Sequence, residues 1–137
     1  MHPEKTSRPG FLAQYRTRIL ENALLLEELQ AACDALRDAG LEEVAIAFGW
    51  DSNLPIEQMW QEHCVPIGEV MAFVAEAERS GISEVGASDI FVESPGFLLT
   101  LCHEGDVHVE GSSALVEQFA RSWELRGYAP YEVRQPA

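Results

Sequence analysis

FLLTLCHEGDVHVEG, residues 97–111, is the stretch of the sequence that decides the fold. Its first five residues are almost all apolar, and its later residues alternate valine with histidine and glutamate. Alternation with a period of two places every second side chain on the same face of a β-strand. Glu-Gly-Asp at 104–106 separates the two runs and is typical of a turn. The stretch therefore predicts a β-hairpin with strands at 97–103 and 107–110.

Two registers of this hairpin are open, and they differ in the residue that faces His108. A two-residue loop at 105–106 would place His103 opposite His108, whereas a three-residue loop at 104–106 would place Cys102 there. We expect the three-residue loop, because it collects the apolar side chains of both strands on one face. These side chains are Phe97, Leu99, Leu101, Val107 and Val109. The opposite face would then carry Cys102, Glu104, His108 and Glu110.

Outward from the hairpin, the spacing of apolar residues predicts the other elements. We expect helices at 9–39, 55–60, 66–80 and from Ser112 or Ser113 to Gly127, and strands at 43–50, 89–93 and 131–133. This pattern predicts an α+β domain: a mainly antiparallel sheet of about four strands, with a long N-terminal helix, a central helix and a C-terminal helix packed on it. A single domain would span residues 1–137, with 1–7 and 135–137 flexible.

The negative charge of the chain is concentrated in its middle. The net charge is −14, and residues 41–110 contain 14 acidic residues against one basic residue, Arg79, which is a net charge of −13 for this segment. Such a segment repels nucleic acid and anionic membranes, and it attracts a cationic partner. We therefore expect a basic protein as the partner, and neither nucleic acid nor a membrane.

The cysteines indicate a reducing compartment. Cys33, Cys64 and Cys102 are odd in number, and no two of them have the C-x-x-C spacing. This favours free thiols over a disulfide framework or a zinc knuckle. The first twenty residues lack the continuous apolar run of a signal peptide, and no apolar run approaches the ~20 residues that span a bilayer. We expect a cytoplasmic protein.

The histidines of the hairpin invite a metal-site interpretation. His103 to His108 resembles the zinc-protease motif H-E-x-x-H with one extra residue, but that motif needs two histidines four apart on a helix, and residues five apart are rotated by about 140°. A hairpin could still combine Cys102, His108 and a carboxylate, yet the sequence supplies no fourth ligand at a suitable spacing. Cys64 and His63 are neighbours whose side chains point apart, so they do not predict a nucleophile with its base. We expect no metal, no cofactor and no catalytic residue, with a small metal-dependent enzyme that uses Cys102 and His108 as an alternative.

Aromatic residues and carboxylates near the predicted element ends indicate a binding surface. Rings supply apolar anchors, and carboxylates steer and pair with lysine or arginine. The candidate partner-binding residues are Trp50, Asp51, Glu57, Trp60, Glu62, Glu84, Asp89, Glu93, Glu104 and Asp106. The sequence leaves open whether Trp50 and Trp60 belong to the core or to this surface, since tryptophans are highly buried on average.

In size and acidity the chain resembles the bacterial immunity proteins of interbacterial toxin systems. Locally the resemblance rests on DIFVES (89–94), FLLTLCHEGDVHVEG (97–111) and RSWELRGYAPYEV (121–133), a strand–hairpin–helix–strand run. It implies a small cytoplasmic α or α+β protein that binds a toxin domain one-to-one and blocks its active site without being an enzyme. An acidic secretion chaperone, which binds an unfolded effector segment and usually dimerises, is an alternative.

Overall fold

The structure is a computed structural model that describes residues 13–133. The strands are β1 (Ala13–Arg16), β2 (Glu43–Phe48), β3 (His63–Pro66), β4 (Ile90–Ser94), β5 (Phe97–Leu101), β6 (Val107–Gly111) and β7 (Tyr131–Glu132). The α-helices are α1 (Asn22–Asp38), α2 (Val70–Arg79) and α3 (Ala114–Arg126), and two short 3-10 helices are η3 (Ile56–Gln58) and η4 (Ile67–Glu69).

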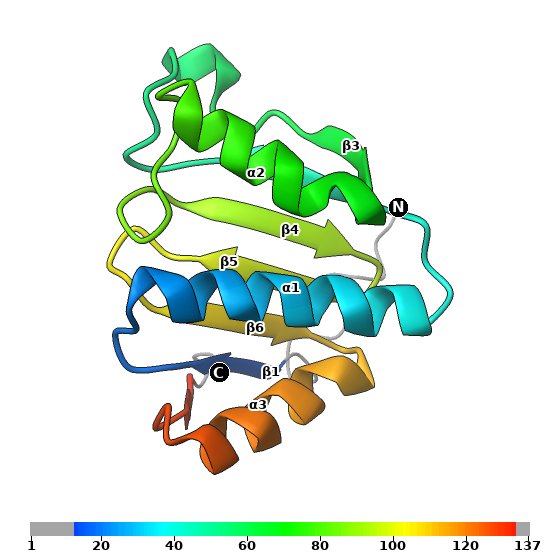
Figure 1. Cartoon of the computed structure of the whole chain (residues 1–137). Coiled ribbons are helices and arrows are strands. Elements are labelled where there is room, and N and C mark those ends of the chain that lie inside the picture. Colours follow the sequence, from blue (N-terminus) through cyan, green and yellow to red (C-terminus); the bar gives the residue numbers. More distant parts are fainter. Residues whose placement is uncertain (1–12, 134–137) are drawn as a thin grey trace.

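All of these strands form one antiparallel sheet in the order β3-β2-β4-β5-β6-β1-β7. The three α-helices cover one face of the sheet, with α2 at the β3 end, α1 over the centre and α3 at the β1 end (Figure 1). The α+β class predicted from the sequence fits this structure. The expectation of about four strands is wrong, because the described chain forms a seven-stranded sheet.

Two of the additional strands lie where the sequence predicts no strand. β1 falls inside the helix expected at 9–39, and α1 begins only at Asn22. β1 lies between β6 and β7, and its Tyr15 pairs with Val109 of β6 and with Glu132 of β7. Those sheet hydrogen bonds join residues about a hundred positions apart and override the local helical spacing. β3 has four residues and ends at Pro66, too short a run for its alternation to be recognised.

The remaining predictions agree more closely with the structure. The Ser113 side chain accepts a hydrogen bond from the Leu115 N–H at the start of α3, and Gly127 ends that helix with a φ of 77°. β7 is the predicted edge strand. The helix expected at 55–60 is shortened to η3, and the helix expected from Pro66 becomes α-helical only at Val70. The expected flexible ends, 1–7 and 135–137, lie outside the described residues.

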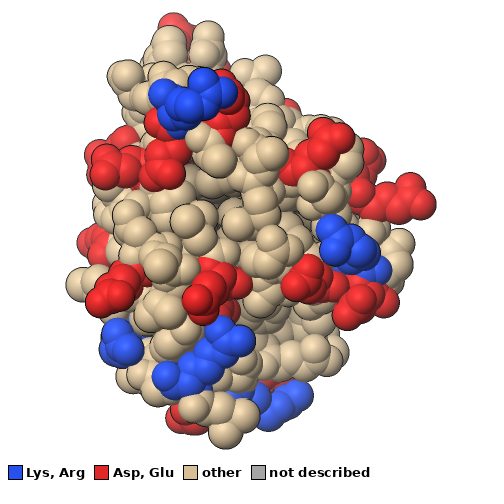
Figure 2. All heavy atoms as spheres, viewed as in Figure 1, with Lys and Arg blue, Asp and Glu red and all other residues tan. Residues whose placement is uncertain are grey.

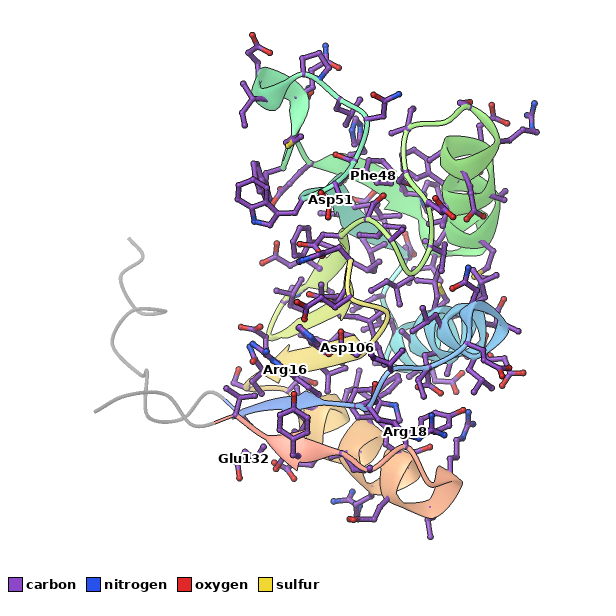
Figure 3. The ribbon with its side chains drawn as sticks, turned by 90° about the vertical axis from the view of Figure 1, so that its left-hand side faces the viewer. Arg16, Arg18, Phe48, Asp51, Asp106 and Glu132 are labelled. Atoms are coloured by element: carbon purple, nitrogen blue, oxygen red, sulfur yellow. The ribbon has the colours of Figure 1, made fainter. Side chains whose placement is uncertain are left out.

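The core lies between the helices and one face of the sheet. Alternate residues of the three central strands point to this side and have no exposed surface: Ile90, Val92, Leu99, Leu101, Val107 and Val109. They form continuous rows across the sheet, since Leu101 pairs with Ile90 and Val107. Burying a side chain of this size contributes roughly 1.5–3 kcal/mol. The residues between them must therefore lie on the opposite face, which none of the three α-helices covers (Figure 3).

The central hairpin has the predicted faces but not the predicted register. Leu101 pairs with Val107 and Thr100 with His108, so five residues, 102–106, connect the two strands. The register expected from a three-residue loop is wrong by two positions. A shift of two preserves both faces because the side-chain period of a strand is two. A residue outside the hairpin holds the longer connection in place: the Leu20 N–H donates a hydrogen bond to the Gly105 carbonyl at 2.9 Å.

One carboxylate lies inside the core and joins two helices. Glu28 of α1 is 1% exposed. Its Oε1 accepts a hydrogen bond from Trp123 Nε1 at 2.7 Å, and its Oε2 accepts one from Arg126 at 2.9 Å. Burial raises the pKa of this carboxyl, and the bonds from Trp123 and Arg126 oppose that rise. Glu28 therefore links α1 to α3 on the covered face of the sheet.

Removing this carboxylate should destabilise the fold. Glu28→Ala leaves the buried Trp123 N–H without its acceptor, and we expect the free energy of unfolding to fall by about 2–3 kcal/mol, because Arg126 is half exposed and can be rehydrated. Glu28→Gln keeps an acceptor for Trp123 and should cost less. Urea denaturation measures both changes, with Glu27→Ala at an exposed neighbouring position as the control. Equal losses in all three variants would contradict this role of Glu28.

Candidate functional site

The candidate partner-binding residues gather, with one exception, at one end of the sheet. β2 and β5 end there and β3, β4 and β6 begin there, because neighbouring strands are antiparallel. Trp50 to Glu62 lie in the β2–β3 connection, Glu84 and Asp89 precede β4, and Glu104 and Asp106 lie in the β5–β6 connection. The exception is Glu93, which lies within β4 on the uncovered face.

Trp50 and Trp60 form an exposed aromatic pair, which answers the question that the sequence left open. Trp50 is 56% exposed and Trp60 is 41% exposed, so neither belongs to the core. Their rings meet edge to face, with centroids 5.1 Å apart and planes at 85°. This geometry is favourable for two indoles. The pair is thus an ordered apolar surface and not two independent side chains.

The backbone beneath the pair is strained and tightly packed. Asp51 has a φ of 64° and Trp60 a φ of 62°, a region that residues with a Cβ rarely adopt. Trp60 also lies directly over Gly49, where an added Cβ would come within 2.9 Å of Trp60 Nε1 and 2.6 Å of the Phe91 ring. Glycine at position 49 therefore allows the indole of Trp60 to rest on the end of β2.

An acidic hollow lies beside the loop that carries Trp50. It has a volume of about 380 Å³, and its ionisable lining residues are Asp51, Glu78 and Glu84. Ser88 Oγ donates to the Asp51 carbonyl at 3.0 Å and so connects the wall of the hollow to the loop that carries Trp50. Glu78 lies near the end of α2 and is not among the residues predicted from the sequence. A hollow with these walls suits the cationic end of a lysine or arginine side chain.

Two of the three aspartates among the candidate residues, Asp89 and Asp106, are buried and bind histidines. Asp89 is 6% exposed, and its Oδ1 accepts hydrogen bonds from the His103 N–H at 2.7 Å and lies 2.8 Å from His103 Nδ1. Asp106 is 8% exposed, and its Oδ2 lies 3.0 Å from His108 Nε2. The exposed acidic groups of this end are instead Asp51, Glu57, Glu62, Glu84 and Glu104.

Cys102 lies between these two aspartate–histidine pairs. Its Sγ, the Asp89 carboxylate and the His103 ring nitrogen lie within 4.8 Å of one another, and the same is true of Sγ with Asp106 and His108. Asp89, Cys102, Asp106 and His108 all belong to the uncovered face, in the alternation opposite to the buried valines and leucines. The alternation of the sequence predicts Cys102 and His108 on this face, and Asp89 and Asp106 are predicted only as partner-binding residues and not as members of this cluster.

This arrangement does not favour a nucleophilic thiol. Burial raises the pKa of Cys102 to about 12, and the nearby Asp106 and Asp89 carboxylates add to the rise. His103 directs the same nitrogen, Nδ1, at Asp89 and at Cys102 Sγ, which is 3.9 Å away, so the ring does not bridge the thiol and the carboxylate. Cys64 is exposed, and the charge of Glu43 raises the pKa of its thiol. A reactive cysteine needs the opposite shift.

An apolar pocket of about 270 Å³ lies on the other side of the sheet, against α2. Phe48 and Phe73 stack in its wall with ring centroids 6.0 Å apart, and Leu54, Ala77 and Ile82 also line it. Phe48 points to the helix side, whereas Asp51 follows at the turn beyond β2 (Figure 3). The pocket is therefore separate from the tryptophan pair and from the histidine cluster.

No protein family, curated protein or solved structure matches this chain significantly. None of the helices within residues 13–133 combines the length and the apolar character that crossing a bilayer requires.

The Asp89–His103 pair should make stability depend on pH. The hydrogen bond to Asp89 raises the pKa of His103 above its ordinary value of 6.5. A group whose pKa is raised by folding stabilises the folded protein. This stabilisation is complete at pH values below the pKa of the unfolded state, and it is lost as the pH rises through the pKa of the folded state. In protein kept metal-free with a chelator, the destabilisation by Asp89→Asn should be largest below pH 6.5 and smaller at higher pH. Urea denaturation at several pH values measures this, and a difference that does not vary with pH would contradict the pairing.

Proposed function

We propose that this protein is a non-enzymatic inhibitor of the immunity-protein type, which acts in the bacterial cytoplasm by binding a basic toxin domain and blocking its active site. The observation that carries the proposal is the exposed Trp50–Trp60 pair beside a group of carboxylates. The resemblance in size, acidity and element order supports the same class of function.

The tryptophan pair has the properties of an interface anchor. Tryptophan is enriched among the residues that contribute most to protein–protein binding, and such anchors sit inside a polar rim. Two large, adjacent and exposed indoles are costly for a monomer to leave in water. Their edge-to-face contact and the strained backbone at Asp51 and Trp60 hold them in one arrangement. A preorganised anchor loses less entropy when it binds.

The charges around the pair favour a basic partner. Asp51, Glu57 and Glu62 lie in the same connection as the tryptophans, and Glu84 and Glu104 are exposed in the neighbouring connections. The hollow lined by Asp51, Glu78 and Glu84 could receive one lysine or arginine of the partner. Many toxin domains that act on nucleic acid must present a basic surface to their substrate. An acidic protein that covers such a surface would exclude that substrate.

The fold also keeps the acidic segment together in space. Residues 41–110 form β3, β2, β4, β5 and β6, which are adjacent in the sheet, together with α2. The segments before and after it, which together carry a net charge of −1, form β1 and β7 at the other edge of the sheet, α3 beside them and α1 over the centre. On the helix-covered face, basic groups are more frequent toward α3, where they mix with acidic groups (Figure 2). A cationic domain would therefore be drawn toward the β2–β5 part of the molecule.

Charge and anchor variants should affect different steps of binding. With a purified partner, neutralising Asp51, Glu57 and Glu62 should slow association by about tenfold at low salt, because exposed charges steer the encounter. The matched control neutralises Asp34, Asp38 and Glu124, which are exposed on α1 and α3 outside the connections that form the candidate surface. Surface plasmon resonance at several salt concentrations measures both. Association that does not depend on salt, or equal effects of the two triple variants, would refute the acidic binding surface.

Alanine at Trp50 or Trp60 should raise the dissociation rate without unfolding the protein. A binding anchor costs about 2 kcal/mol or more of affinity when truncated, whereas an exposed position has a small effect on stability. The partner is sought by capture from native lysate, with the double variant Trp50→Ala/Trp60→Ala as the negative control, and it is identified by mass spectrometry. Co-expression of a captured toxin in a sensitive bacterium then tests the biological role. Survival must require the wild-type protein and fail with the double variant; unchanged protection would exclude the proposed anchor.

A further inference from the structure

We propose that Cys102, Asp106 and His108 bind one divalent transition-metal ion, and that zinc is the ion that these donors suit best. This site is independent of the partner surface, because Cys102 and Asp106 are buried at the base of the β5–β6 connection, His108 is half-buried, and none of the exposed carboxylates takes part. The sequence suggested no metal because it supplied too few ligands at suitable spacings. The fold supplies Asp106 at the place where Cys102 and His108 meet.

The donor atoms are already gathered at short distances. A thiol sulfur, a carboxylate oxygen and an imidazole nitrogen lie within 4.8 Å of one another. Asp106 Oδ2 and His108 Nε2 are 3.0 Å apart, close to the separation of two neighbouring ligands around a tetrahedral ion with metal–ligand distances of about 2.0–2.1 Å. Small side-chain adjustments would therefore complete the coordination. Thiolate and imidazole together favour zinc over magnesium or calcium, which prefer oxygen ligands.

A second observation points to a ligand at this place. Asp106 Oδ1 is buried and accepts no hydrogen bond of normal geometry from the residues that the structure describes. A buried carboxylate oxygen without a partner is unfavourable, and coordination to a cation would satisfy it. Cys102 and the two aspartates also bring several potentially negative groups into one buried cluster. A divalent cation would compensate the negative charge of such a cluster.

The backbone that carries the ligands is held in place before any ion binds. Cys102 N–H donates to the Asp106 carbonyl at 2.9 Å, and Gly105 N–H donates to the Cys102 carbonyl at 3.0 Å. The segment after β1 clamps the same connection, since Val107 N–H donates to Thr17 Oγ1 at 3.2 Å. Two of the ligands, Cys102 and Asp106, thus face each other across a closed turn. Such preorganisation is a requirement for tight metal binding.

The neighbouring Asp89–His103 pair is the competing ligand set, and the structure favours Asp106 and His108. Asp89 Oδ1 already interacts with two nitrogens of His103, the backbone N and the ring Nδ1. The His103 side chain is 33% exposed, whereas the His108 side chain is 13% exposed. The orphan oxygen belongs to Asp106 and not to Asp89. With three protein ligands, the fourth position around zinc would be taken by water.

The test is a titration of the full-length chain, reduced and stripped with a chelator, first with Zn²⁺ by calorimetry and then with Co²⁺ by absorption. We expect one ion per chain, a thiolate-to-cobalt charge-transfer band, and a higher melting temperature with Zn²⁺. Cys102→Ser and His108→Gln should each weaken binding by at least about 100-fold, because even changes outside the ligand shell cost about 10–100-fold. Cys64→Ser, at an exposed thiol outside the cluster, should bind like the wild type.

His103→Gln separates the two ligand sets, and it should retain binding within a few-fold of wild type. Circular dichroism shows which variants are folded, and the thiolate-to-cobalt band of the wild type tests the cysteine even if Cys102→Ser does not fold. Failure of the wild type to bind Zn²⁺ or Co²⁺ would overturn the proposal. Binding that survives Cys102→Ser would do so as well. Loss of binding in His103→Gln with retention in His108→Gln would assign the ion to the other pair and refute the ligand set proposed here.

Discussion

The alternation of side chains along the three central strands is the constraint on which the rest of the structure depends. Ile90, Leu101 and Val107 form one of the buried rows that face the helices. Their burial determines that the residues next to them in each strand point to the uncovered face of the sheet. Cys102 directly follows Leu101, and Asp106 directly precedes Val107, so both must lie on the uncovered side. The hydrophobic core thus determines where the cluster of Cys102, Asp106 and His108 lies, although these three residues point away from the core.

Two kinds of acidic group lie at the end of the sheet where β2 and β5 end. Carboxylates in the long connections are exposed and remain available to a partner, whereas Asp89 and Asp106 continue the strand alternation and are buried against histidines. Exposed charges act over a distance and are screened by salt. Buried ones act on contact, through hydrogen bonds or a coordinated ion. An acidic composition alone does not distinguish these roles, because both kinds come from the same segment of the chain.

The first strand decides how the two halves of the chain combine. β1 lies between β6 and β7, and the residues after it hold the β5–β6 connection through Thr17 and Leu20. Glu28 then ties α1 to α3. The N-terminal segment therefore contacts both the hairpin connection that carries Cys102 and Asp106 and the C-terminal helix. These contacts place β1 beside β7 and α3, and the acidic middle segment forms the other part of the sheet.

Local physics explains what the sequence by itself determined. The period of two predicted the central hairpin and its two faces, Ser113 and Gly127 marked the ends of α3, and the charge count identified the acidic segment. Tertiary structure decided the rest. The position of β1 depends on partners about a hundred residues away, and the hairpin register depends on the residues after β1 that hold Gly105. The place of Trp60 over Gly49 depends on how the β2–β3 connection packs on the end of β2. The meeting of Asp106 with Cys102 and His108 depends on the observed hairpin register. No local pattern records them, because residue spacing fixes the face of a strand but not its neighbours.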